Sequence, residues 1–285
     1  MFKVVIDSNN SHNTISKYLD KLVVSIQRKK QLNSSNAFYV NRVLVDSTYE
    51  LKENDFLEID LSIFEIKKYR PVEYNLTILY EDEYIIVIDK PNGYIIYDVD
   101  DKQDAICNFL RYYYKQYKKD SLIIPIHRLD FDTSGCLVFA KDIITAAGLS
   151  KSFEKNEVTK KYVALVSGVV NKEGSINKNI GKDRHVNGKM VVCERGKEAL
   201  TKYRLIDTNN KLSLVEAIPV TGRTHQVRVH LAYIGNPLVG DVLYKSKVKA
   251  SRVMLHCLSI SFIHPIKEKA VTVYSPLPQE FKIDK

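Results

Sequence analysis

The sequence predicts an α+β protein in which a small module of helices and short strands precedes a larger domain built on a mainly antiparallel mixed sheet. Strand-like apolar runs such as Lys161–Val170 follow one another with helices inserted irregularly, without regular βαβ alternation. Residues 1–70 contain neither glycine nor proline, and the charged stretch Glu65–Asn75 marks a change in character. We therefore expect a module over residues 1–66 and a main domain over residues 67–285.

The N-terminal module is expected to begin with a helix and to end with short strands. Apolar residues at helical spacing predict a helix over Thr14–Ile26, with Asn13 available as its cap. The segment 37–60 is typical of short strands separated by polar turns, where asparagine takes the place of glycine because it tolerates the left-handed backbone region. Between the helix and the strands lies a basic patch formed by Arg28, Lys29 and Lys30.

The main domain is expected to open with two strands within Leu76–Gly93. Tyrosines and aliphatic residues then repeat at helical spacing over residues 104–117, which predicts a helix capped by Asp104. Most of its tyrosines are expected in the core. The remainder of the domain is expected to be rich in strands.

A second helix of this domain is predicted between Thr224, a suitable N-cap, and Gly235, a suitable residue after its end. Arg228 lies beside the apolar stripe of this helix, near enough to the core to be drawn inward, and a buried arginine needs a carboxylate partner. His225 and His230 are interpreted as structural hydrogen-bonding residues, because nothing nearby completes a metal site. The stripe that should face the core consists of Val227, Leu231 and Ile234.

Composition favours a polyanionic partner and argues against several protein classes. The chain has 43 basic and 34 acidic residues, a net charge of +9, which suits the neutralisation of phosphates. Its four cysteines are far apart and form no CxxC pair, which argues against a zinc site or a disulfide framework. No apolar run approaches the roughly 20 residues of a membrane span, and the N-terminus lacks a signal-peptide pattern. These observations predict a cytoplasmic protein.

The segment Ile123–Gly135, IIPIHRLDFDTSG, leads from an apolar strand into a cluster of charged residues. A calcium loop is disfavoured because Lys141 occupies the position that needs a bidentate glutamate. A serine hydrolase is disfavoured because Ser134 lacks the GxSxG elbow. A structural turn accounts for Asp132 and Gly135, but it does not explain the segment His127–Asp130, HRLD.

Four ordered motifs in the main domain resemble those of the RluA-type pseudouridine synthases. HRLDFDTSG begins at His127, and KKYVALVSG begins at Lys160. GRTHQVRVH begins at Gly222, and RVMLHCLSISFIHP begins at Arg252. The similarity extends from about Leu76 to the C-terminus and implies the α+β pseudouridine synthase fold. The N-terminal module is similar to the S4 RNA-binding module, although both of that module's turn glycines are replaced.

The resemblance implies a reaction and a set of catalytic residues. The family converts uridine in RNA to pseudouridine by breaking the N1–C1′ bond, turning the base over and rejoining it through C5. Asp130 matches the catalytic carboxylate, which either attacks C1′ or removes the 2′ proton. Arg228 matches the arginine paired with it, and such a cation favours the ionised form of a buried acid. Tyr162 matches the tyrosine that stacks on the uracil and takes the C5 proton, and Leu255 matches the apolar residue beneath the base.

The resemblance also implies how RNA is held. A paired or stacked uridine must be flipped out to reach such a pocket, and Arg128 matches the arginine that fills the vacated position or holds the phosphate. Lys161, Arg223 and the basic patch Arg28–Lys30 are expected to contact backbone phosphates. The isomerisation needs neither redox chemistry nor an external nucleophile, so neither an organic cofactor nor a metal is implied. We expect a monomer without a membrane partner.

The expected substrate is large-subunit ribosomal RNA, with tRNA as the alternative because the family modifies both. A non-catalytic RNA-binding assembly protein is a second hypothesis, and the intact HRLD segment, Tyr162 and Arg228 argue against it. A metal-dependent nuclease is a third, and the sequence lacks clustered carboxylate ligands for it. Tritium release from C5-labelled uridine in RNA would separate an enzyme from a binding protein.

Overall fold

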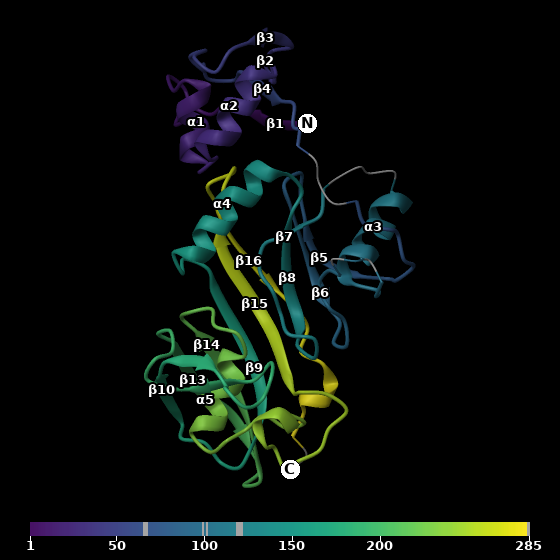
Figure 1. Ribbon diagram of the computed structural model, residues 1–285, viewed down its shortest axis with the longest axis vertical. Coiled ribbons are helices and arrows are strands. Elements are labelled where there is room, and N and C mark those ends of the chain that lie inside the picture. The colour runs from purple at the N-terminus through teal and green to yellow at the C-terminus, as the bar shows by residue number, and fades with distance from the viewer. Residues whose placement is uncertain (65–67, 99, 101, 118–121, 284–285) are drawn as a thin grey trace.

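The computed structural model of the chain describes residues 1–64, 68–98, 100, 102–117 and 122–283. The molecule is elongated, with a small N-terminal module at one end and a long twisted sheet that extends to the other (Figure 1). The expected boundary between residues 66 and 67 lies outside the described residues. A four-stranded sheet precedes that boundary and a ten-stranded sheet follows it. This arrangement agrees with the predicted α+β fold preceded by a small module.

The N-terminal module is a four-stranded antiparallel sheet, in the order β1-β4-β2-β3, with two helices packed against it. The sequence pattern does not predict β1, which pairs with β4 along its whole length and buries Phe2 in the core. The elements of the module are β1 Phe2–Val5, α1 Ile15–Lys21, α2 Ile26–Ser34, β2 Phe38–Val40, β3 Val43–Val45 and β4 Phe56–Ile59.

The single helix predicted over Thr14–Ile26 is wrong, because α1 ends at Lys21 and α2 begins only at Ile26. Val23 between them has a left-handed conformation with φ of 60°. Ser25 begins α2 by accepting a hydrogen bond from a backbone amide of the first turn. The cap of α1 is Thr14 rather than Asn13, because the Thr14 hydroxyl accepts from an amide of that helix at 3.2 Å. The basic patch consequently lies within α2.

The turns of the module confirm that asparagine serves where glycine is usual. Asn41 and Arg42 between β2 and β3 have φ of 51° and 70°, and Asn54 before β4 has φ of 68°. The Asn41 side chain also donates to Oδ1 of Asp55 at 2.8 Å and accepts from the backbone amide of Phe56 at 2.9 Å. These side-chain contacts offset the cost of a left-handed backbone at a residue other than glycine.

The main domain confirms the predicted mixed, mainly antiparallel sheet. Its order is β10-β13-β14-β9-β15-β8-β6-β5, with β16 added to β15 and β7 to β8. Only β8 and β15 run parallel among the described pairings. The strands are β5 Thr77–Glu81, β6 Ile85–Lys90, β7 Ile124–Pro125, β8 Ser134–Ala140, β9 Thr159–Ser167, β10 Glu173–Asn177, β13 Leu200–Thr208, β14 Leu212–Pro219, β15 Leu255–Ile263 and β16 Ala270–Tyr274.

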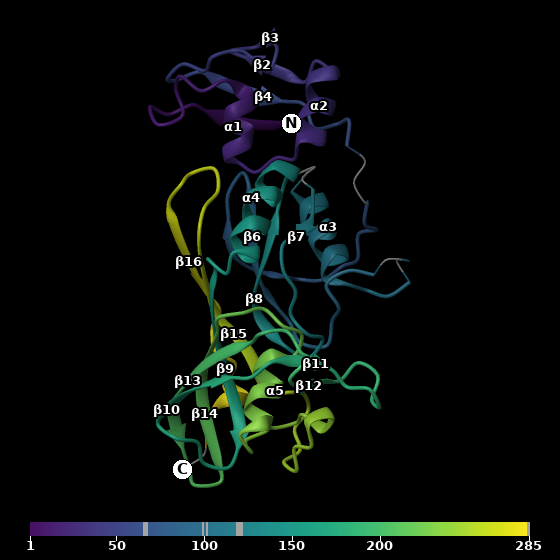
Figure 2. The ribbon, with the colours of Figure 1, turned by 60° about the vertical axis from the view of Figure 1, so that its left-hand side comes forward.

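Helices cover parts of this sheet, and a separate hairpin of β11 and β12 lies beside α5 (Figure 2). The two helices expected in this domain are confirmed, but the cap predicted for the first is wrong, since Asp104 pairs with Arg70 at 2.6 Å instead. The remaining elements are α3 Ile106–Gln116, β11 Ile180–Lys182, β12 Met190–Val192, α4 Ile143–Glu154, α5 Gln226–Tyr233 and two 3₁₀ turns, Val242–Tyr244 and Gln279–Phe281.

Helix α5 begins one residue later than the predicted cap at Thr224. His225 occupies the N-cap position in a left-handed conformation with φ of 55°, which directs the chain into the helix. Gly235 has φ of 88° after the helix, as predicted. Val227 and Leu231 are buried as expected, whereas Ile234 is 36% exposed and lies outside the buried stripe because the helix has already ended at Tyr233.

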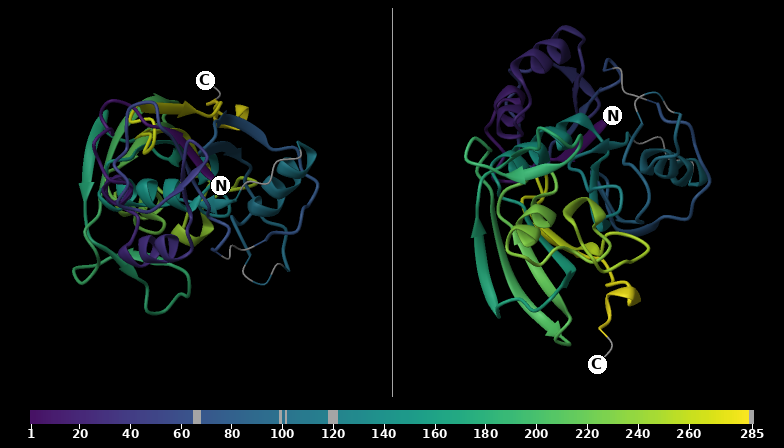
Figure 3. Two further views of the ribbon diagram at one scale, coloured as in Figure 1. Left: turned by 90° about the horizontal axis from the view of Figure 1, so that it is seen from above. Right: turned by 60° about the horizontal axis from the view of Figure 1, so that its bottom comes forward.

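One apolar core runs through both parts of the chain. The module rests on the α4 end of the main domain, and the view from above shows the purple module over the teal segments (Figure 3). Polar contacts fix this position: the Tyr84 hydroxyl donates to the Lys3 carbonyl at 2.6 Å, and Lys21 pairs with Glu268 at 2.6 Å. Among the described residues, no helix has the length and apolarity needed to cross a membrane.

Candidate active site

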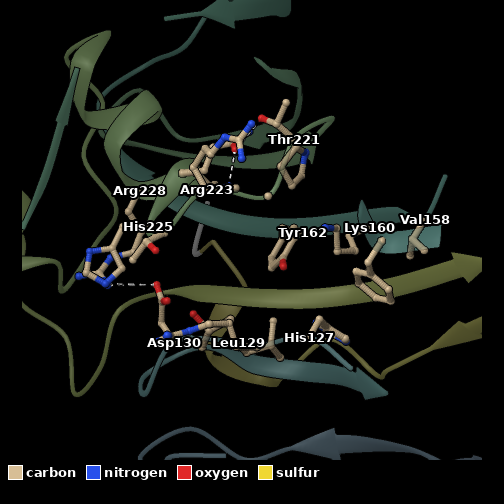
Figure 4. Close-up of a pocket in the computed structure, with 18 of the residues that line it drawn as sticks. His127, Leu129, Asp130, Val158, Lys160, Tyr162, Thr221, Arg223, His225 and Arg228 are labelled. Atoms are coloured by element: carbon tan, nitrogen blue, oxygen red, sulfur yellow. Dashed lines mark hydrogen bonds and ion pairs between the residues drawn. The ribbon is translucent and has the colours of Figure 1, made fainter. Parts of the chain in front are cut away.

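A cavity of about 410 Å³ is enclosed by the turn before β8, the first half of β9, the start of α5 and the end of α4. Tyr162 lies near its middle (Figure 4). On one side of Tyr162 is the Asp130 end, formed by Asp130, His225 and Arg228. On the other side is the Lys160 end, where Figure 4 shows His127, Val158 and Lys160. Phe153 belongs to this end because its ring lies against Lys160 and His127.

The turn that carries Asp130 is fixed by its own backbone and by a close approach of two strands. The Thr133 amide donates to the Asp130 carbonyl at 3.1 Å. Gly135 follows with φ of 107°, and a Cβ there would lie 2.2 Å from the carbonyl oxygen of Cys257 on β15. Glycine is thus required where β8 and β15 meet, and the end of the HRLDFDTSG motif serves the fold.

Lys90 lies beneath this turn with its side chain fully buried. Its ammonium donates to the backbone carbonyls of Pro91, Phe131 and Thr133 at 2.9, 3.1 and 2.9 Å. Burial lowers the pKa of Lys90 to about 8, against the opposing effect of the nearby carboxylate of Asp130. The ammonium therefore ties the strand before the turn to the turn itself.

Arg228 is buried and joins two carboxylates, which confirms the expectation that it needs an acidic partner. Its Nε and Nη2 donate to the two oxygens of Asp241 at 2.7 and 2.9 Å, and its Nη1 donates to Oδ2 of Asp130 at 3.2 Å. Burial alone would lower the pKa of Arg228, but its bonds to Asp241 and then Asp130 raise it above its ordinary value. Asp241 is itself fully buried and holds the guanidinium in one orientation.

His225 is the second group that faces Asp130. Its Nε2 lies 3.8 Å from Oδ2 of Asp130, and its Nδ1 lies 2.9 Å from the Tyr244 hydroxyl oxygen. That hydroxyl also accepts from the Met190 amide at 3.1 Å, and the Tyr244 ring centroid lies 5.2 Å from the Arg228 guanidinium carbon. Burial lowers the pKa of His225 despite the charge of Asp130, so the imidazole is neutral at pH 7. Tyr244 thereby holds both groups that contact Asp130.

Both contacts reach the same oxygen of Asp130. Within the described part of the chain, no group forms a hydrogen bond or ion pair with Oδ1, whereas Arg228 and His225 both approach Oδ2. The Asp130 side chain is 19% exposed. One carboxylate oxygen is held by the protein, and the other is available to a reacting group.

Tyr162 and Leu255 line the cavity from the neighbouring strands β9 and β15. The Tyr162 side chain is 9% exposed, and burial raises its pKa well above the ordinary value, with smaller contributions from Cys257 and Asp130. The phenol is therefore un-ionised at neutral pH. That state suits stacking against a flat base, while removal of a proton by this oxygen requires the ionised form.

The structure brings most of the predicted site residues to this cavity. Asp130, Arg128, Tyr162, Arg223, Arg228 and Leu255 all line it. Arg128 is exposed, and Arg223 is half-buried with its Nε donating to the Glu198 carbonyl at 2.9 Å. Lys161 does not line the cavity, because successive residues of a strand point to opposite faces and Tyr162 faces inward.

The basic patch lies apart from the cavity, on α2 of the N-terminal module. Arg28 and Lys30 are exposed, but Lys29 is paired with Asp20 at 2.5 Å, which neutralises part of the patch. His230 has the structural role that the sequence indicates: its ring nitrogens lie 2.8 Å from the Thr201 hydroxyl and 2.9 Å from the Lys178 carbonyl.

Four residues of the site are not identified by the sequence patterns. Lys160 could have been found from the period of two along β9, which places it on the same face as Tyr162. Asp241, Tyr244 and Lys90 carry no local signal, since each acts on a segment distant in sequence. Among the described residues, no group of three or more metal-ligating side chains could hold an ion.

Residues 84–233 match the family described as RNA pseudouridylate synthase. An RNA pseudouridine synthase of Bacillus subtilis, YhcT, described as uncharacterized, is 36% identical over 248 residues, which cover 85% of this chain and 82% of the relative. Ribosomal large subunit pseudouridine synthase D of Zymomonas mobilis is 32% identical over 279 residues, which cover 91% of this chain and 88% of the relative.

The solved structures include a similar fold. Human RNA pseudouridylate synthase domain containing 1 matches with a TM-score of 0.61 and 29% identity, over 71% of this chain and 83% of that chain. The family match, the similarity over most of the chain and the shared fold agree with the motifs around Asp130, Tyr162 and Arg228. This chain belongs to the RluA-type family of RNA pseudouridine synthases and is an isomerase that acts on uridine in RNA.

Proposed function

We propose that this enzyme converts specific uridines of large-subunit ribosomal RNA to pseudouridine, with Asp130 as the catalytic carboxylate. The observation that carries the proposal is the set of contacts on Oδ2 of Asp130, which leave its second oxygen available in a cavity that also holds Tyr162. The choice of ribosomal RNA is supported by relatives named for the large subunit, from Zymomonas mobilis and Borreliella burgdorferi.

In the proposed reaction, the free oxygen of Asp130 attacks C1′ or takes the 2′ proton, and the N1–C1′ bond breaks. The uracil turns over, and C5 bonds to C1′ as the Asp130–C1′ bond breaks or as the 2′ proton is returned. The C5 proton is then lost and N1 gains a proton. Arg228 pairs with the carboxylate, and removal of the cation would leave an uncompensated charge in a partly desolvated site. Tyr162 and Leu255 hold the ring while it turns. Tyr162 is the proposed acceptor of the C5 proton, a role that requires its phenol, which is un-ionised in the free enzyme, to lose its own proton first.

RNA is proposed to be held by basic groups around the cavity and on the module. Arg128 and Arg223 lie at the cavity and suit the phosphate of the flipped nucleotide or the position it vacates. The segment after Tyr244 adds exposed lysines that also suit phosphates, Lys245, Lys247 and Lys249. Lys161 and the S4-like module of residues 1–66, through Arg28 and Lys30, are proposed to extend this surface along the RNA. The enzyme is proposed to act as a cytoplasmic monomer.

The test measures tritium released to water from deproteinised ribosomal RNA and tRNA that contain C5-tritiated uridine. Wild-type protein is expected to release tritium from large-subunit RNA, and Asp130→Asn is expected to lose at least roughly 10²-fold in rate. Asp132→Asn is the matched control, since it changes a carboxylate of the same turn that does not line the cavity. Undiminished release by Asp130→Asn would overturn the assignment of the catalytic residue.

The same assay separates the alternatives. Release from tRNA alone would make this a tRNA pseudouridine synthase of the same family. A non-catalytic assembly factor predicts salt-sensitive RNA affinity without release from any RNA. Mapping pseudouridines in RNA from cells that lack the gene would identify the modified positions.

A further inference from the structure

Lys160 lies at the end of the cavity opposite Asp130. It precedes Tyr162 by two residues on β9, so both side chains are on one face of the strand, and Figure 4 shows Tyr162 between Lys160 and Asp130. The Lys160 ammonium lies 5.4 Å from the ring centroid of Phe153. Phe153 in turn stacks on His127, with ring centroids 4.9 Å apart and an interplanar angle of 17°. The Lys160 end is therefore an aromatic wall with one ammonium on it.

This ammonium has no acidic partner within the described part of the chain. Glu154, which also lines the cavity, pairs with Lys151 at 3.0 Å instead. His127 beside it is neutral, because burial lowers its pKa to about 3. Burial also lowers the pKa of Lys160. A half-buried ammonium without a partner is unfavourable for stability, which points to a ligand that supplies the missing acceptor.

We infer that Lys160 donates a hydrogen bond to the uracil carbonyl that lies opposite the glycosidic bond, an inference that rests on the proposed reaction at Asp130. With C1′ at Asp130 and the ring against Tyr162, the ring atom opposite N1 points toward Lys160. In uridine that atom is C4, which carries a carbonyl oxygen. An ammonium offers three donors and no acceptor, so it matches this oxygen.

The same contact serves the product. When the base turns about the line through N3 and C6, N1 exchanges place with C5, and C4 exchanges place with C2. Once C5 is bonded to C1′, the atom opposite the new bond is C2, and it also carries a carbonyl oxygen. Lys160 therefore meets a carbonyl oxygen before and after the rotation.

This contact also selects uracil over cytosine. Cytosine carries an amino group on C4, which is a donor, whereas uracil carries an acceptor there. A lysine that faces the amino group gains no hydrogen bond and remains desolvated without a partner. A site that hydrogen-bonds one group rejects the analogue lacking it more strongly than an apolar pocket does.

The position of Lys160 favours a base over a phosphate. Arg128 is exposed at the cavity, where a phosphate keeps most of its hydration, whereas Lys160 lies deeper against Phe153. A phosphodiester anion pressed against an aromatic wall would lose more hydration than a neutral carbonyl loses. Lys160 is thus assigned to the base and the arginines to the backbone.

The test compares Lys160→Met with wild type on a short RNA. This RNA carries the target uridine, identified by mapping pseudouridines in cells that lack the gene. Single-turnover rate constants for pseudouridine formation are measured by nucleoside chromatography, for uridine and for 4-thiouridine, whose sulfur is a weaker acceptor. Lys160→Met is expected to lose roughly 10- to 100-fold with uridine, the effect of one charged hydrogen bond. Wild type is expected to be slowed by 4-thiouridine, and Lys160→Met is expected to treat the two RNAs alike.

Lys155→Met is the matched control, because Lys155 is an exposed lysine at the end of α4 that does not line the cavity. Full activity of Lys160→Met would overturn the inference. A phosphate contact would instead show as an equal 4-thiouridine effect in both enzymes, together with a salt dependence of KM whose slope falls by about one. Failure of the wild type to form pseudouridine in any RNA would contradict the proposed function and is a separate outcome.

Discussion

The two ends of the cavity differ in whether their charged side chains have ionic partners within the protein. At the Asp130 end every charged group has a partner: Arg228 joins Asp130 and Asp241, and Tyr244 holds the neutral His225. At the Lys160 end the ammonium has an aromatic neighbour, Phe153, and no acidic partner among the described residues. The Asp130 end is thus completed by the protein itself, whereas the Lys160 end is completed only when a substrate is bound.

The largest effect is expected when the network of the Asp130 end is broken. Arg228→Met leaves the buried Asp241 without its bidentate partner, which is expected to cost about 3–5 kcal/mol of unfolding free energy and to abolish detectable activity. Urea denaturation measures the loss. Arg204→Met is the control, because Arg204 and Glu216 form an exposed pair worth about 0–1 kcal/mol. Equal losses in both variants would contradict a special role for the buried network.

The second largest effect is expected from acidification, which should lower the free energy of unfolding through His127 at the Lys160 end. Desolvation, and then the charge of Lys160, lower the pKa of the half-buried His127 from its ordinary value of 6.5 to about 3. The folded protein therefore binds fewer protons than the unfolded chain between these values. The contribution of the neutral His127 to the free energy of unfolding is therefore fully present above about pH 6.5. It is lost as pH falls toward about 3, by up to about 1.4 kcal/mol per pH unit.

Urea denaturation of wild type and His127→Gln between about pH 7 and about pH 5 tests this effect. The variant is expected to lose less stability than wild type as the pH falls, because glutamine does not titrate. Parallel pH profiles for the two proteins would show that His127 is not kept neutral by burial.

A smaller effect is expected from the residue that supports both partners of Asp130. Tyr244→Phe keeps the ring beside Arg228 but removes the hydroxyl between His225 and Met190. We expect a loss of about 1 kcal/mol in the free energy of unfolding. We also expect kcat to fall roughly 10-fold with little change in KM, because His225 beside Asp130 is no longer oriented. Tyr274→Phe on the exposed surface is the control. An unchanged kcat would limit Tyr244 to a structural role.

The smallest stability effect is expected at the Lys160 end, and its sign is opposite to that expected at the Asp130 end. Lys160→Met removes an ammonium without an acidic partner, so unfolding free energy is expected to stay constant or to rise by as much as about 1 kcal/mol. Lys141→Met, which removes a buried lysine paired with Glu81 at 2.6 Å, is expected to lose about 3 kcal/mol. A comparable loss in Lys160→Met would show that Lys160 stabilises the fold.

Local patterns predicted the fold class, most of the strands and the existence of the two main helices, because apolar periodicity reports which face of an element is buried. They failed at helix boundaries, where single residues decide the outcome. Val23 in the left-handed region divided one expected helix, and His225 rather than Thr224 began another. Such left-handed conformations depend on the packing of the neighbouring elements, and they cannot be predicted from a valine or a histidine in the sequence.

The sequence by itself determined the family and the residues Asp130, Tyr162, Arg128, Arg223 and Arg228 as candidates, because the reaction needs those side chains within short, ordered motifs. Only the tertiary structure decided their partners. Asp241 and Tyr244 reach Arg228 and His225 through the fold, and Lys160 rather than Lys161 enters the cavity because β9 turns Tyr162 inward. Contacts of this kind depend on strand register and burial, which no local stretch of sequence encodes.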